Sequence, residues 1–382
     1  MKHNRKIIYL AGFLFSMTLA LVSYINSSFL ENYVGKNYVG IIYIVASIIT
    51  IVGLSEMPRI LTRLGNRVTI MLFCFFIFIS LVTLAFTNSA LVAIIFFILY
   101  FISTGFVVAS LDIFIEDFSK NSPIGGLRGL YLTVTNGAWI VAQVISGSII
   151  AKSSFSGIYL FSASFMVLMF IVSNLFLNNF KDPEYKKFPI LRTIKSFIKN
   201  KNISRIYFSN LFLQFFYAWM VIYSPIYLHE YIGFGWNKIG FIFAIMLIPF
   251  VVVDIPLGKL SDKIGEKKML IVGFSIIAIS VLVIPFIKEP ALFIWAFALF
   301  ATRIGAATIE IMNDSYFFKV TKEENAGEVS FFRNAPFVAY VIAPLLALPI
   351  LLLVPSFKYI FFVLSAIMLI GLLNILKLKD VK

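Results

Sequence analysis

The stretch Leu292–Tyr316, LFIWAFALFATRIGAATIEIMNDSY, decides how the whole chain is interpreted. Its apolar run is long enough to cross a bilayer as a helix, because about 20 residues at 1.5 Å each span the hydrocarbon core. It nevertheless carries Arg303, Glu310 and Asp314, whose spacings of seven and four place them on one helical face. Ionisable groups at that depth are costly unless they face a partner or a water-filled cavity. We therefore predict that this helix lines a polar cavity inside a membrane protein.

The composition indicates an all-α polytopic membrane protein. Of the 382 residues, 60% are hydrophobic and only 13% are charged, whereas a soluble protein needs more polar residues to cover its surface. The formal net charge of +14 fits basic loops beside a membrane and requires no nucleic-acid partner. The single cysteine, Cys74, and two histidines, His3 and His229, leave neither an internal disulfide nor a His/Cys metal site. We expect no cofactor.

Apolar runs of spanning length recur along the chain and predict twelve transmembrane helices. They lie near residues 7–29, 38–59, 69–87, 90–113, 128–150, 156–178, 206–229, 238–258, 269–287, 290–315, 330–352 and 356–377. An even count puts both termini on one side, and most Lys and Arg residues fall on that same side. By the positive-inside rule, we predict a multi-pass protein of the cytoplasmic membrane with both termini in the cytoplasm.

A long connection divides the predicted spans into six and six. We predict an N-terminal bundle over residues 1–178, a cytoplasmic linker over 179–205 and a C-terminal bundle over 206–382. After Pro189, apolar and basic residues of the linker separate at helical spacing. This pattern predicts a basic amphipathic helix that lies on the inner leaflet.

An internal repeat relates the two predicted bundles. Asp112 and Glu116 in the fourth span match Glu310 and Asp314 in the tenth span at an offset of 198 residues. Glycines of neighbouring spans recur at similar offsets. Two six-span halves in the same orientation are a parallel duplication, which places a substrate site between the halves near mid-membrane.

The loop after the eighth predicted span reads GKLSDKIGEKK over residues 258–268. It resembles the conserved loop signature of the major facilitator superfamily, Gly-x-Leu-x-Asp-Arg-x-Gly-Arg-Arg, with Gly258, Asp262 and Gly265 at the matching positions. Together with twelve spans, a six-plus-six repeat and a long basic central loop, this resemblance extends over the whole chain. It implies two pseudo-symmetric six-helix bundles and a secondary transporter.

The resemblance also implies a cytoplasmic gate made of ion pairs. A first-half copy of the signature, PRILTRLGNR at residues 58–67, has Thr62 where the family has aspartate, so the carboxylate role stays with Asp262. Glu116 and Arg128 are similar to the Glu…Arg-Gly element of the superfamily's sugar transporters. The residues assigned to the gate are Glu116, Asp314, Arg128, Asp262, Gly258, Gly265, Arg63, Arg67 and Arg333.

In the superfamily, spans one, four, seven and ten line the central cavity, and polar residues gather on these spans here. The candidate substrate ligands are Arg303, Tyr24, Asn26, Gln214, Tyr217 and Tyr223. The guanidinium of Arg303 is either an anchor for an anionic or hydroxyl-rich solute or a permanent ion-pair partner. The tyrosine rings are either stacking surfaces for a solute or packing residues.

Asp112 and Glu310 lie one helical turn deeper in their spans than Glu116 and Asp314. A carboxylate in a dry setting binds a proton more readily. We therefore expect Asp112 and Glu310 to couple transport to protons. The alternative is that all four acids belong to the gate.

We predict secondary active transport of a small organic solute by alternating access, coupled to protons, in a monomer surrounded by membrane lipid. No enzymatic activity is expected, because no nucleophile–base pair or cofactor loop is found. One alternative is efflux of drugs or amphipathic compounds, although the drug-antiporter signature Gly-x-x-x-Gly-Pro is missing from span five. Another is a non-transporting scaffold or sensor on the same fold, which would have little reason to keep buried charge.

Overall fold

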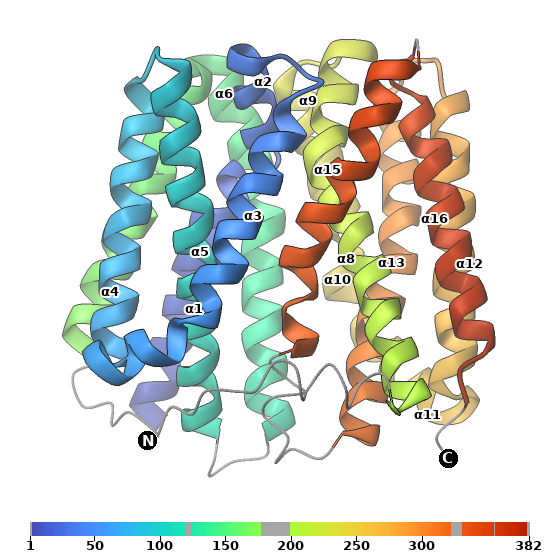
Figure 1. Ribbon diagram of the computed structural model, residues 1–382, viewed down its shortest axis with the longest axis horizontal. Coiled ribbons are helices and arrows are strands. Elements are labelled where there is room, and N and C mark those ends of the chain that lie inside the picture. Colours follow the sequence, from blue (N-terminus) through green and yellow to red (C-terminus); the bar gives the residue numbers. More distant parts are fainter. Residues whose placement is uncertain (1, 120–123, 177–198, 322–330, 355, 380–382) are drawn as a thin grey trace. The chain divides into compact units, whose positions relative to one another are not determined.

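The computed structural model describes residues 2–119, 124–176, 199–321, 331–354 and 356–379, which are almost entirely helical and contain no β-strand (Figure 1). The helices of the first half are α1 (Lys2–Ser23), α2 (Asn26–Val34), α3 (Val39–Ser55), α4 (Met57–Phe86), α5 (Ala90–Ser119) and α6 (Ile124–Phe176). Those of the second half are α8 (Lys201–Ile226), the π-helix η1 (Tyr227–Tyr231), α9 (Trp236–Leu247), α10 (Pro249–Val252), α11 (Asp254–Ile264), α12 (Glu266–Val283), the 3-10 helix η2 (Ile284–Phe286), α13 (Leu292–Val320), α15 (Ala335–Leu353) and α16 (Tyr359–Leu376). The all-α class is confirmed for this part of the chain. Residues 177–198, which include most of the helix predicted after Pro189 in the linker 179–205, lie outside it.

Within the described residues, nine helical stretches are long and apolar enough to cross a bilayer, so the protein is a multi-pass membrane protein. Val39–Ser55 and Trp236–Val252 are apolar but shorter. The 53 residues of α6 would extend about 80 Å if straight, but Ser154 departs from helical geometry with φ 68°. This break lies between the predicted spans 128–150 and 156–178. The number of twelve spans stays a prediction.

Four glycines of the described chain have positive φ, and they form two pairs. Gly35 and Gly233 have φ of 75° and 79°, and Gly65 and Gly265 have φ of 75° and 88°. The members of each pair lie 198 (233 − 35) and 200 (265 − 65) residues apart. Left-handed backbone favours glycine, because a Cβ would clash there. The backbone therefore follows the repeat inferred from the sequence.

The chain separates into two compact units. Unit 1 contains residues 1–187 and 235–244, and unit 2 contains 188–234 and 245–382. In unit 1, α1 packs mainly on α6, while α4 packs on α5 and α6, and α3 packs on α5. In unit 2, α12 packs on α13 and α16, and α8 packs on α13, α15 and α16. The bundle boundaries predicted at residues 178 and 206 are untested and stay predictions.

Polar side chains and small residues fix these helix contacts. In unit 1, Nε2 of Gln143 in α6 donates a buried hydrogen bond to the carbonyl of Ala20 in α1, at 2.9 Å. In unit 2, α12 and α13 approach at two glycines: a Cβ on Gly305 would lie 2.6 Å from the carbonyl oxygen of Gly273. Small residues at a crossing let two membrane helices come this close.

Candidate functional site

Arg303 lies in the interior of unit 2, near the middle of α13, and its side chain is 1% exposed. Its Cζ lies 4.8 Å from the ring centroid of Phe216 and 5.5 Å from that of Tyr217, both on α8. Aromatic faces carry negative potential and attract a guanidinium, by about 2 kcal/mol when the pair is desolvated. The two rings therefore stabilise a cation that would otherwise be costly in a membrane-spanning helix.

Tyr217 links this cation to an acid. Its hydroxyl donates to Glu310 Oε2 at 2.6 Å, and Glu310 lies two turns after Arg303 on α13. Hydrogen bonds to ionised groups are shorter and stronger than those between neutral groups. Guanidinium, phenol and carboxylate thus form one connected set, which we call the α8–α13 network: Arg303, Tyr217 and Glu310.

Glu310 is enclosed by protein less than Arg303 is. Its side chain is exposed, as is that of Asp314 one turn further on, whereas Arg303 is buried. The face of α13 that carries all three residues therefore runs from the interior of unit 2 to its surface. The carboxylate of Glu310 is therefore open to its surroundings, whereas the guanidinium of Arg303 is covered by protein.

Gln214 lies on the same face of α8 as Tyr217. Its Nε2 donates to Asn210 Oδ1 at 3.5 Å, and Asn210 Nδ2 donates to the carbonyl of Phe332 at 3.2 Å. Asn210 was not among the predicted site residues, although its spacing of four and seven from Gln214 and Tyr217 would have placed it there. Phe216 was also missed, and nothing distinguishes it among the 43 phenylalanines of the chain.

Tyr223 lies apart from the α8–α13 network. It is 1% exposed and packs in an aromatic cluster, with ring centroids 5.6 Å from Trp219 and 6.2 Å from Phe357. These contacts correspond to the packing alternative for this ring.

Two candidates on the first span are buried in unit 1. Asn26 is 4% exposed and accepts a hydrogen bond from the Tyr159 hydroxyl at 2.9 Å. Tyr24 is 5% exposed, and its ring centroid lies 4.6 Å from that of Phe243. It lines a small cavity of about 10 Å³ beside Gly147, with room for about one water molecule. In the described structure these residues contact protein.

Asp112, the other predicted coupling acid, is half-buried on α5. It lies close enough to Tyr131 of α6 to interact with it electrostatically. Tyr131 in turn covers Gly12 of α1, where an added Cβ would overlap the tyrosine ring. Asp112 in unit 1, like Glu310 in unit 2, thus has a tyrosine neighbour. The tyrosine belongs to α6 in unit 1 and to α8 in unit 2.

The predicted gate is described only in part. Arg63 and Arg333 are exposed, and Arg67 donates to the backbone oxygen and Oδ1 of Asn174 at 2.9 and 3.0 Å. Gly265, which matches a glycine of the loop signature, ends α11 with a positive φ. The remaining gate residues have side chains or surroundings outside the described part of the chain: Glu116, Arg128, Asp262 and Gly258. The ion-pair network stays a prediction.

An ion pair in unit 2 between a buried acid and a partly exposed lysine was not predicted. Glu266, 2% exposed, pairs with Lys319 and accepts a hydrogen bond from Ser315 Oγ at 3.1 Å. At the equivalent place in unit 1, the buried Asn66 donates from Nδ2 to the carbonyl of Ser110 at 3.0 Å. In each unit, the polar residue after the positive-φ glycine ties the start of one span to its neighbour. In the sequence, the place of Asn66 and Glu266 directly after repeat-related glycines was the signal that could have identified them.

The family model of the Major Facilitator Superfamily matches residues 8–336 and 225–381 of this chain. No curated protein sequence matches this chain. Among solved structures, the POT family transporter PepTSo is similar with a TM-score of 0.81 at 11% identity, over 98% of this chain and 97% of that chain. A point mutant of the nucleoside transporter NupG is similar with a TM-score of 0.77 at 10% identity, over 98% and 99% of the two chains.

A POT family transporter in complex with 5-aminolevulinic acid has a TM-score of 0.77 at 12% identity, over 98% of this chain and 95% of that chain. At such identities the structural likeness shows the fold, and the family match extends over most of the sequence. The resemblance found in the loop signature is confirmed: the chain belongs to the Major Facilitator Superfamily.

Proposed function

We propose that this protein is a secondary active transporter that moves a small organic solute by alternating access and couples this movement to protons. Membership of a transporter superfamily favours transport over enzymatic activity. The observation that carries the proposal is the α8–α13 network in unit 2. Charge buried in a membrane-spanning helix is costly, and proteins keep it mainly where ions or solutes pass.

Each member of the network has a distinct role in this proposal. Glu310 is exposed and takes up or releases the coupling proton. The hydroxyl of Tyr217 donates a hydrogen bond to the ionised carboxylate of Glu310. Arg303, whose guanidinium lies over the ring of Tyr217, stabilises the negative charge of that carboxylate. Protonation of Glu310 removes that charge and weakens the hydrogen bond, so it biases the equilibrium between two conformations. Asp112 is the corresponding acid of unit 1.

Arg303 acts on the solute indirectly in this scheme. At 1% exposure its guanidinium lies behind Phe216 and Tyr217, so a solute would meet Tyr217, Gln214 and Glu310 first. Peptide and nucleoside transporters among the similar structures suggest polar solutes with several hydrogen-bonding groups as the first class to screen.

The experiment has two stages. Purified protein is screened by thermal shift against peptides, nucleosides, sugars, organic acids, amino acids, lysolipids and cationic dyes, because a ligand that binds only the folded state raises the melting temperature. Each stabilising solute is then tested for uptake into proteoliposomes. We expect accumulation of at least one polar solute, with protein-free liposomes as the baseline. Stabilisation by a solute without any protein-dependent flux, inward or outward, would favour a sensor instead.

We further propose that both termini lie in the cytoplasm and that the protein works as a monomer in the cytoplasmic membrane. The support for the orientation is the gathering of Lys and Arg residues on the side of the termini. A cysteine placed after Lys382 should react with a membrane-impermeant thiol reagent only after the cells are opened. Labelling of intact cells would contradict this orientation.

A further inference from the structure

Two repeat-related segments combine exposed cations with exposed apolar side chains just before a membrane span. In unit 1, Arg63 and Leu64 precede the positive-φ glycine at 65, and in unit 2 Lys263 and Ile264 precede the one at 265. Leu64 is 43% exposed and Ile264 is 39% exposed. Both cations are exposed as well. The same pairing of a cation with an aliphatic side chain thus recurs 200 residues apart.

The backbone holds these pairs at the membrane boundary. The residues that follow the two glycines, Asn66 and Glu266, are buried and hydrogen-bonded to the neighbouring helix of their own unit. A membrane-spanning helix continues from each of them, Glu266–Phe286 in unit 2 and the long part of Met57–Phe86 in unit 1. The exposed pair before each glycine therefore lies where a span begins, at the depth of lipid headgroups.

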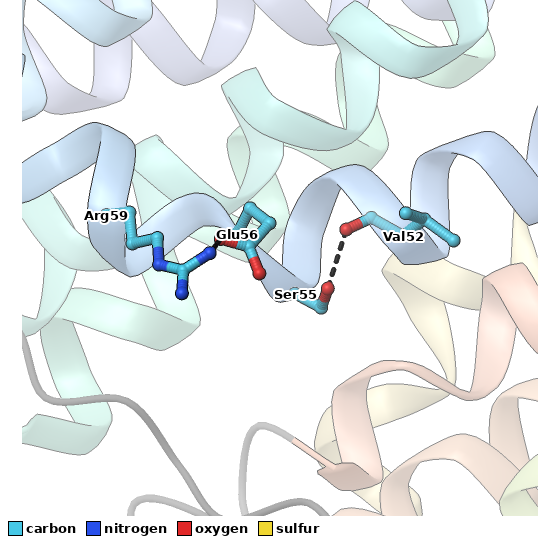
Figure 2. Close-up of polar contacts among 4 residues, drawn as sticks. All are labelled: Val52, Ser55, Glu56 and Arg59. Atoms are coloured by element: carbon cyan, nitrogen blue, oxygen red, sulfur yellow. Dashed lines mark hydrogen bonds and ion pairs between the residues drawn. The ribbon is translucent and has the colours of Figure 1, made fainter.

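The surface in unit 1 also has a depression of about 490 Å³, lined by Glu56, Arg59, Ile60 and Arg63. Two of these lining residues, Arg59 and Glu56, form an ion pair, which Figure 2 shows. Both side chains of this pair are well exposed, and an exposed ion pair contributes little to stability. Two cations and one acid leave the depression a net charge of +1. An anionic group can replace Glu56 as the partner of Arg59.

We propose that each surface binds the headgroup of an anionic phospholipid, whose acyl chain lies along Leu64 in unit 1 or Ile264 in unit 2. A phosphate accepts hydrogen bonds from Arg or Lys, and an aliphatic side chain at headgroup depth packs on an acyl chain. A guanidinium binds phosphate through two parallel hydrogen bonds, whereas an ammonium is a point charge. The surface at Arg63 therefore binds more tightly than the surface at Lys263.

The test is native mass spectrometry of the full-length protein in detergent, titrated with phosphatidylglycerol or with phosphatidylcholine. We expect two tightly retained phosphatidylglycerol molecules and no comparable retention of phosphatidylcholine. The variant Arg63→Gln should weaken the tighter site about fivefold, and Lys263→Gln the weaker one, since each cation near an anionic surface contributes about that factor. Leu64→Ser tests the acyl contact without changing charge.

The matched control removes two exposed cations elsewhere, Lys238→Gln with Lys288→Gln. It should retain both lipids with unchanged affinity. An equal loss in this control, equal retention of phosphatidylcholine, or full competition by glycerol 1-phosphate would overturn the proposal. The first two results would indicate general charge attraction or detergent replacement, and the third a site for free phosphate.

Discussion

Helices α5 and α13 are repeat-related, and their comparison shows where the two units diverge. Both carry an acid at the equivalent position, Asp112 in unit 1 and Glu310 in unit 2, 198 residues apart. At the position that corresponds to Arg303, however, α5 has Gly105. Asp112 lies beside a tyrosine of α6, whereas Glu310 bonds to Tyr217 of α8, whose ring also contacts the cation.

This difference separates what the duplication preserves from what it does not. The pairs of positive-φ glycines are kept, because other residues are strained in that conformation. The buried cation Arg303 and its aromatic partners belong to unit 2, whereas α5 of unit 1 has a glycine at the corresponding position. We infer that the two units share a backbone plan and that the charge-handling chemistry lies mainly in unit 2.

The largest expected effect comes from removing that cation. Arg303→Met keeps the unbranched stem of the side chain and loses the charged guanidinium, so Glu310 and Tyr217 lose the group that stabilises the carboxylate. We expect uptake to fall more than about 100-fold, the scale of breaking a buried charge interaction. Uptake in proteoliposomes measures this. Lys358→Met is the control, because Lys358 lies over the ring of Tyr359 but outside the network. Comparable loss in the control would contradict a specific role.

Removal of one hydroxyl should have a smaller effect. Tyr217→Phe keeps the ring over Arg303 and removes the hydrogen bond to Glu310, which costs about 1.5–3 kcal/mol for a charged acceptor. We expect uptake to fall about tenfold or more at a given pH. Tyr223→Phe on the same helix is the matched control and should retain activity. Equal behaviour of the two variants would show that the hydroxyl of Tyr217 has no part in transport.

The helix crossing of unit 2 provides a stability test of the comparison. At the offsets of the repeat, Gly273 and Gly305 of unit 2 correspond to Phe73 and Val107 of unit 1. Unit 1 thus has larger side chains at this place, and Phe73 stacks on Phe106 with ring centroids 4.1 Å apart. In Gly305→Ala the new Cβ meets backbone at 2.6 Å, so we expect the melting temperature to fall by about 4 °C or more. In Gly137→Ala the Cβ meets open space, and alanine favours the helix. An unchanged melting temperature for Gly305→Ala would contradict the close crossing.

The smallest expected effect concerns the ion pair between Glu266 and Lys319. Glu266→Gln keeps the hydrogen bond from Ser315 and leaves Lys319 unpaired. Because 45% of the Lys319 side chain is exposed, water compensates much of the loss, and we expect a fall in melting temperature of about 1–3 °C. Added salt should narrow the difference from the wild-type protein. A drop as large as that of Gly305→Ala would mean that the pair is more buried than the structure shows.

The sequence predicted the continuous elements well and the contacts between them less well. Helix α13 was expected over 290–315 and extends over Leu292–Val320, because a long apolar run strongly specifies a helix. The loop signature also marked Gly265, where the structure has a positive φ. The aromatic partners of Arg303 did not, since Phe216 becomes distinctive only when α8 packs on α13. The grouping of residues 235–244 with unit 1 likewise depends on tertiary contacts.

The central claim is that carboxylates of the two repeat-related helices couple transport to protons. The most direct test is pH-gradient-driven uptake in proteoliposomes that contain the wild-type protein or the double variant Asp112→Asn with Glu310→Gln. We predict that the wild-type protein accumulates its solute when a proton gradient is applied and that a protonophore abolishes this. The double variant should bind the solute but show no response to the gradient. Intact pH-driven accumulation by the double variant would contradict the claim.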